Sequence, residues 1–95
     1  MNNKQIKKCK EIADHYGQHT QEAQTISELS ELLQVLTRRQ SQRGTDWKEK
    51  LIDEISDVQI MIQQIIDIHD LNKSDITERI DFKLDRQLGR IREEG

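Results

Sequence analysis

Two pairs of acidic residues have the spacing expected of a metal site: Glu28 with Glu31, and Glu54 with Asp57. Residues three positions apart project from nearly the same side of a helix, so each pair presents two carboxylates together. Both pairs interrupt apolar stripes at positions where a helical bundle usually has Leu or Ile. Carboxylates near a core repel one another and lose hydration unless cations neutralise them. Since carboxylate oxygens are preferred ligands of Mg2+ and Mn2+, these four carboxylates predict a site for a hard divalent cation.

The two acidic pairs are placed so that they can meet across a helical hairpin. A short polar segment, Ser41–Thr45, contains Gly44 and predicts a turn between the two helices that carry them. Glu31 and Glu54 lie at roughly similar distances along the chain from this turn. An antiparallel hairpin therefore places these two residues at about the same height, with the other acid of each pair one turn further from the loop.

Long stretches of helix-forming residues predict an all-α fold. The 95 residues include four glycines and no proline, so few helix breaks are expected. The expected helices cover Asn3–Tyr16, about Thr20 to Gln42, about Trp47 to His69, and a last helix that follows Ser74 as its N-cap. Asp46, three residues before Glu49, resembles the start of a capping box for the third helix. The length predicts a single domain over residues 1–95, folded as a small bundle of about four helices.

The apolar content is low for a bundle that folds alone. Hydrophobic residues make up 33% of the chain and charged residues 35%, and only three side chains are aromatic. The third expected helix is nonetheless apolar on most of its sides, from Leu51 to Ile68. A helix of this kind must be buried on most sides, and one short chain cannot cover it. We therefore expect copies of the chain to associate and complete the core.

Charge and targeting signals restrict the remaining classes of function. A net charge of -3 and a pI near 5.6 argue against a general nucleic-acid binder, which needs an excess of Lys and Arg. No run of residues is long and apolar enough to span a membrane, and Met1 to Lys10 lacks the apolar core of a signal peptide. The single cysteine, Cys9, cannot form an internal disulfide and is expected on a helix face. These features predict a cytoplasmic protein.

The acidic motifs and their surroundings resemble a known family. Glu-x-x-Glu, 22 intervening residues and Glu-x-x-Asp are similar to the signature of the MazG-like, all-α nucleoside triphosphate pyrophosphohydrolases. The segments that also resemble this family are His15-Tyr16-Gly17, Gln21 and Gln24, residues 26–32, residues 53–58, and the basic tail with Lys83, Arg86 and Arg90. The resemblance covers most of the chain.

This resemblance implies hydrolysis of a (deoxy)nucleoside triphosphate between its α and β phosphorus atoms, which yields the monophosphate and pyrophosphate. It implies Mg2+, with Mn2+ as a substitute, bound by Glu28, Glu31, Glu54 and Asp57, which would also be the catalytic residues. A metal ion bound there would neutralise developing charge and lower the pKa of an attacking water. We expect association through the third helix to give a homodimer or, as the family resemblance suggests, a homotetramer built from two dimers.

Five further residues are candidates for substrate binding. They are Lys83, Arg86, Lys50, Gln24 and Trp47. All but Lys50 also have a structural explanation: the basic pair suits the C-terminal end of a helix dipole, a Trp in a first turn often closes the end of a bundle, and Gln24 can have a purely structural role. One departure from the family concerns Ser27, because many relatives have an acidic residue directly before the first motif glutamate. If that residue is the base in those relatives, this chain uses another group or reacts more slowly.

Two alternatives therefore remain beside the enzyme. The first is a catalytically weak protein that binds and senses nucleotides in the presence of Mg2+. The second is a structural helical module that only oligomerises, in which the acidic residues form a solvated face or interhelical ion pairs.

Overall fold

The chain folds into four α-helices in the computed structural model, which describes residues 1–38 and 45–95. The helices are α1 (Asn3–Tyr16), α2 (Gln18–Thr37), α3 (Thr45–Ile68) and α4 (Lys73–Glu94), and the described residues contain no strand. The predicted all-α class is thus confirmed. None of the described helices is long and apolar enough to cross a membrane.

The caps at the helix ends agree with the predictions for α1 but differ from them for α3 and α4. α1 has the predicted bounds, begins with a capping box between Asn2 and Gln5, and ends at Gly17, whose φ of 87° favours glycine. The prediction that Ser74 is the N-cap of α4 is wrong, because Asn72 has that position. The side chain of Asn72 accepts hydrogen bonds from the backbone N–H and the hydroxyl of Ser74. Asp46 lies inside the first turn of α3 rather than before it.

Other predicted bounds differ by a few residues or cannot be compared. α2 begins at Gln18 instead of Thr20, because Gly17 alone separates it from α1. α3 begins at Thr45 and ends at Ile68, close to the predicted Trp47 and His69. The predicted turn at Ser41–Thr45, except for its last residue, and the predicted end of the second helix at Gln42 lie outside the described residues.

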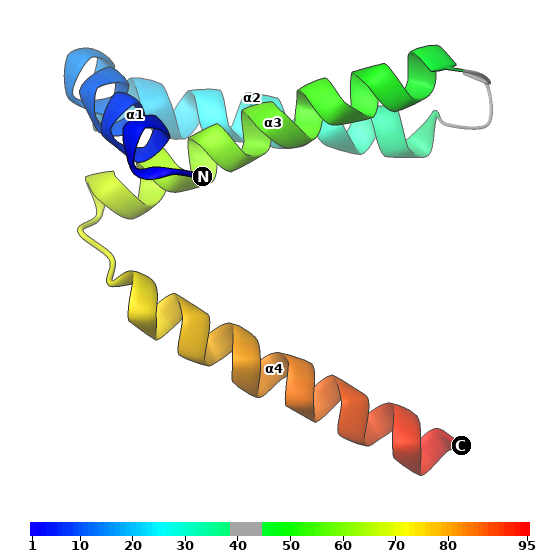
Figure 1. Cartoon of the computed structure of the whole chain (residues 1–95). Coiled ribbons are helices and arrows are strands. Elements are labelled where there is room, and N and C mark those ends of the chain that lie inside the picture. Colours follow the sequence, from blue (N-terminus) through cyan, green and yellow to red (C-terminus); the bar gives the residue numbers. More distant parts are fainter. Residues whose placement is uncertain (39–44) are drawn as a thin grey trace.

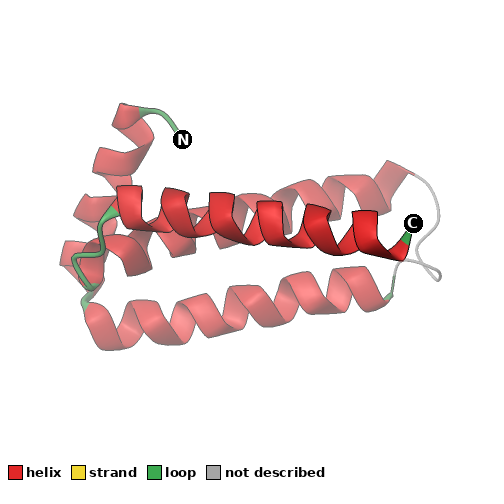
Figure 2. Cartoon of the chain, turned by 90° about the horizontal axis from the view of Figure 1, so that it is seen from below, coloured by secondary structure: helices red, strands yellow, loops and turns green. Residues whose placement is uncertain are grey.

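Helices α2 and α3 form an antiparallel hairpin, and α1 packs against both at the end away from their connection (Figure 1). Figure 2 shows the same arrangement from below. The residues of α2 that are turned inward are Gln21, Thr25, Glu28, Leu32 and Val35, and those of α3 include Trp47, Leu51, Glu54, Val58, Met61, Ile65 and Ile68. Both sets repeat at alternating steps of four and three. This heptad spacing is typical of coiled-coil packing, and we call these inward positions the seam.

The two sides of the hairpin differ in character. On one side, Glu22 and the Nε2 atom of His69 are 2.8 Å apart across the hairpin. On antiparallel helices the heptad runs in opposite directions. One heptad from the Glu22 and His69 contact, this register places Leu29 opposite Ile62. Two heptads from it, the register places Leu36 opposite Ile55. The residues exposed on this side, which we call the apolar face, are Ile26, Leu29, Leu33, Leu36, Ile52, Ile55 and Ile62.

The interior of a single chain is small. The buried apolar residues among those described are Cys9, Ala13, Val58 and Met61. The prediction that Cys9 lies on a helix face is correct, and that face is buried. In contrast, Ile52 and Ile62 of α3 are 56% and 48% exposed, so one copy does not cover the helix that was expected to be buried on most sides.

Helix α4 diverges from the hairpin after the short connection at Asp70 to Asn72 (Figure 1). None of its residues is buried. The radius of gyration is 16.5 Å, well above the ~12 Å expected for a compact chain of this length. The structure of one copy is therefore open, with an extended helix that lacks a packing partner among the described residues.

Candidate metal centre

The predicted acidic residues come together at the seam of the hairpin. Glu28, Glu54 and Asp57 each present one carboxylate oxygen, and these three oxygens lie within 4.8 Å of one another. All three side chains are half-buried. Glu28 and Glu54 occupy seam positions that the heptad pattern would otherwise give to Leu or Ile, so the helix packing itself brings their charges together.

Glu31 borders this group without belonging to it. Its charge raises the pKa of Glu54 and both residues line the same hollow, while the Glu31 side chain remains more exposed than the other three. Across the seam, Asp57 and Glu28 each present an oxygen to this group. Acids of α2 and α3 therefore face one another, as the antiparallel arrangement predicted.

Burial and nearby negative charge make Glu54 and Asp57 resist ionisation. Burial raises the pKa of Glu54, and the charges of Glu31, Glu28 and Asp57 raise it further. Burial likewise raises the pKa of Asp57, and the charge of Glu28 raises it further. In the absence of a cation, the structure thus favours protons on Glu54 and Asp57.

Two carboxylate oxygens of the cluster lack a protein partner. Glu28 Oε2 and Glu54 Oε2 are buried and have no hydrogen-bond partner among the described residues. Such oxygens are strong acceptors, and leaving them unpaired is unfavourable. A half-buried, all-oxygen set with orphaned atoms fits a hard divalent cation such as Mg2+, for which Glu28, Glu54 and Asp57 would supply the ligands and Glu31 a neighbouring carboxylate.

Two of the predicted substrate-binding residues lie beside the acidic cluster. The Nε2 atom of Gln24 donates a hydrogen bond of 2.8 Å to Glu28 Oε1, which holds that carboxylate in place. Lys50 lines a hollow of about 190 Å3 together with Glu31 and Glu54. Positive charge next to the carboxylates is suited to phosphate groups.

The other three predicted substrate-binding residues do not reach the cluster within one copy. The indole N–H of Trp47 donates to the backbone carbonyl of Val35 at 3.1 Å, so this residue joins the ends of α3 and α2, in agreement with its structural explanation. Lys83 and Arg86 lie on α4, which diverges from the hairpin (Figure 1). The guanidinium of Arg86 sits 5.7 Å from the ring centre of Phe82 on the same helix.

The sequence interpretation missed two residues of the site. Gln34 and Arg38 line the same hollow as Lys50. Their positions three and seven residues after Glu31 place them along one side of α2. This spacing could have identified them, because it continues the line of the first acidic motif toward the loop.

Comparisons of the chain with protein-family models, with curated proteins and with solved structures gave no match.

Proposed function

We propose that this protein is a Mg2+-dependent nucleoside triphosphate pyrophosphohydrolase similar to the MazG-like all-α enzymes. The observation that carries the proposal is the convergence of Glu28, Glu54 and Asp57 at the seam, with Glu31 lining the hollow beside Glu54. The two acidic motifs are 22 residues apart in sequence, and they nevertheless meet. A purely solvated acidic face would not place carboxylates at positions that the heptad gives to apolar residues.

The proposed reaction combines a bound cation with side chains of the chain. Water attacks the α phosphorus, and the bond from that phosphorus to the oxygen bridging to the β phosphorus breaks, which releases pyrophosphate. Bound Mg2+ supplies charge neutralisation on the phosphates and a more acidic water. One of the four carboxylates accepts the proton of the attacking water. Gln24 keeps Glu28 oriented, and Lys50 faces the phosphate groups from the hollow beside Glu31 and Glu54.

The assembly proposed with this function is a homodimer that buries the apolar face, or a tetramer of two such dimers. Leu33 and Ile26 on that face are 61% and 67% exposed. A second copy of the hairpin carries the same heptad spacing, so its side chains can interdigitate with this face to make a four-helix bundle. A stable interface buries about 800 Å2 per partner, and we expect the apolar face and α4 to contribute to it together.

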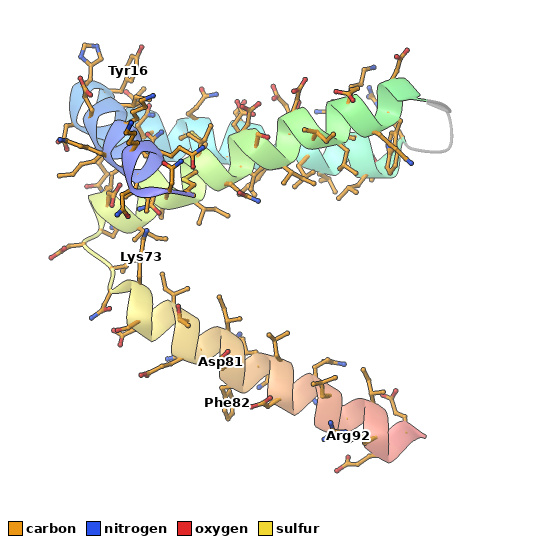
Figure 3. All side chains as sticks on the ribbon, in the orientation of Figure 1. Tyr16, Lys73, Asp81, Phe82 and Arg92 are labelled. Carbon is orange, nitrogen blue, oxygen red and sulfur yellow. The ribbon has the colours of Figure 1, made fainter. Side chains whose placement is uncertain are left out.

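Helix α4 supports the same assembly. Phe82 projects from the side of α4 away from the hairpin (Figure 3). By helical geometry Ile80 and Leu84 then lie toward the hairpin side, yet they are 50% and 58% exposed. A second copy covers this stripe, which also includes Leu88 and Ile91. In that arrangement Lys83 and Arg86 of one copy approach the carboxylates of another and bind the substrate phosphates.

The proposed reaction is tested with a panel of nucleoside and deoxynucleoside triphosphates incubated with the protein and Mg2+. Pyrophosphate and orthophosphate are measured separately. We expect pyrophosphate together with the monophosphate, and no release when EDTA is added. Glu31→Gln should abolish the release, whereas Glu11→Gln, an exposed acid of α1, should not. Orthophosphate as the sole product contradicts the proposed cleavage position.

A nucleotide sensor is the second candidate, and Ser27 is the observation that favours it. This residue is exposed on α2 directly before Glu28, where many members of the resembled family have an acid. Mg2+-dependent nucleotide binding with negligible pyrophosphate release would identify the sensor. If neither Mg2+ nor nucleotide binds and Glu31→Gln stabilises the fold, the chain is a structural oligomerisation module.

A further inference from the structure

A pair of buried glutamines crosses the seam near the end of the hairpin that contacts α1. The Nε2 atom of Gln21 donates to Gln64 Oε1 at 2.7 Å. Gln21 is 5% exposed and Gln64 is 1% exposed, which makes Gln64 the most deeply buried large side chain among the described residues. Gln21 occupies a seam position of α2, where an apolar side chain would pack without an amide to satisfy. We call these two residues the glutamine pair.

The glutamine pair is related to the acidic cluster by one heptad on each helix. Seven residues after Gln21 on α2 comes Glu28, and seven residues before Gln64 on α3 comes Asp57. These two acids each contribute an oxygen to the acidic cluster across the seam. Seven residues further on each helix, Val35 and Lys50 line the hollow. Three successive heptad steps thus follow one antiparallel register, and the glutamine pair is the deeply buried hydrogen bond that belongs to it.

Apolar residues alone specify this register weakly. Leu, Ile and Val side chains along the seam can pack in nearby registers at similar energies, whereas a buried amide must find its partner. Displacing one helix by a turn moves its residues by ~5.4 Å. Such a displacement separates the two amides and also pulls Glu28 away from Asp57. The hydrogen bond therefore penalises the registers in which the acidic cluster does not form.

We infer that Gln21 and Gln64 are positioning residues that fix the register of α2 against α3 and thereby align the acidic cluster for its cation. The inference rests on the proposed function for the identity of the cation, but the register itself can be measured separately. Neither glutamine is expected to contact substrate or metal. Their effect passes through the alignment of Glu28 with Asp57.

The test replaces both glutamines by methionine, which has a similar shape and no amide. Register is measured by the rate of disulfide formation in a Cys9→Ser background. Leu29→Cys combined with Ile62→Cys reports the observed register. Leu29→Cys combined with Ile66→Cys reports a displaced register. With the glutamines present, we expect the first combination to form its disulfide at least about tenfold faster. With the Met pair, the two rates should approach each other. A Met pair that keeps the full preference overturns the inference.

Mg2+ affinity, measured by calorimetry, provides the second readout. We expect the Met pair to weaken Mg2+ binding by at least about tenfold while the far-UV circular dichroism stays helical. The matched control is Gln63→Met: Gln63 is also buried, but it donates to Asp67 of its own helix and does not cross the seam. This variant should retain both the disulfide preference and the Mg2+ affinity. If it changes them as much as the Met pair does, the inference is wrong.

A gentler variant keeps the test decisive if the Met pair does not fold. Gln21→Asn retains an amide but is one methylene too short for the 2.7 Å contact with Gln64, and the same loss of disulfide preference is expected.

Failure of the proposed function looks different from failure of this inference. In the first case the unmodified protein does not bind Mg2+, yet the disulfide preference still depends on the glutamines. In the second case Mg2+ binds and neither readout responds to them.

Discussion

A carboxylate oxygen of Glu28 on α2 and one of Glu54 on α3 lie within 4.8 Å of each other across the hairpin, and an oxygen of Asp57 lies within the same distance of both. Ionised carboxylates this close repel one another. The cluster therefore contains a site at which either a proton or a metal cation reduces the repulsion. This competition links the stability of the fold to pH and to Mg2+.

The first prediction concerns pH in the absence of metal. Burial raises the pKa values of Glu54 and Asp57 above their ordinary values of 4.5 and 3.8. The folded state then binds protons more tightly than the unfolded state. The resulting stabilisation is complete below the ordinary values and is lost as the pH rises through the raised ones. We expect the Tm of the metal-free protein to fall by about 5 °C or more between pH 4 and pH 7.5, measured by circular dichroism in EDTA.

The second prediction concerns the addition of Mg2+ at neutral pH. A cation that binds the ionised carboxylates of the folded chain stabilises it according to its concentration relative to Kd. A hundredfold excess over Kd raises the free energy of unfolding by ~2.7 kcal/mol. The increase should diminish toward pH 5, because protons compete with the metal for the same oxygens. A Tm that does not respond to Mg2+ at any pH would contradict the metal centre.

The third prediction concerns Glu54→Gln, which removes one of the repelling charges at the centre of the cluster. Without metal at pH 7.5, the variant should be more stable than the original chain by about 1 kcal/mol, since it replaces a poorly compensated charge by a neutral amide. Its stability should no longer increase with Mg2+, and pyrophosphate release should fall by more than about 100-fold. Glu11→Gln is the control, because Glu11 is exposed on α1. Parallel behaviour of the two variants would show that the cluster binds no cation.

The sequence determined the positions of the helices better than it determined what each helix packs against. The steps of three and four along α2 and α3, with the predicted turn around Gly44, were sufficient for the helical hairpin and for the meeting of Glu28 with Asp57. The apolar residues of α2 were interpreted as one stripe. They form two: Leu32 and Val35 point into the seam, whereas Ile26 and Leu33 lie on the apolar face. Periodicity alone does not distinguish a stripe that packs within the chain from one that is left for a partner.

The glutamine pair was missed for a related reason. A glutamine at a seam position looks like a polar interruption of an apolar pattern, and its partner lies 43 residues away. Only the register of the two helices connects them. Gln34 and Arg38 differ in this respect, because their spacing after Glu31 was visible in the sequence, and only their place in the hollow beside Lys50 depends on the geometry of the hairpin.

The fourth prediction concerns the apolar face. Leu33→Asp places a charge at a side chain that is 61% exposed in one copy and buried in the proposed dimer. We expect the Kd of the dimer to rise by at least about 100-fold. The change is measured by light scattering coupled to size-exclusion chromatography. Tyr16→Asp is the matched control, because Tyr16 is 57% exposed on α1, outside the apolar face. A chain that is monomeric before any substitution would exclude the proposed assembly.

The fifth prediction concerns the basic residues of α4. Lys83, Arg86 and Arg90 follow one another at steps of three and four, so they lie on one side of the helix, while Arg92 lies on a different side. Replacing Lys83 and Arg86 together by Ala should raise KM for the nucleotide by at least tenfold, because phosphate contacts are lost. The Mg2+-dependent rise in Tm should persist, since the carboxylates remain. Arg92→Ala is the control of equal charge and should leave KM unchanged.

Mixed dimers test whether the basic residues act on a neighbouring copy. In mixtures with the Glu54→Gln variant, the double variant with Lys83→Ala and Arg86→Ala should regain pyrophosphate release, because a mixed dimer combines intact carboxylates from one copy with an intact α4 from the other. No recovery in verified mixed dimers would place the phosphate contacts within a single copy.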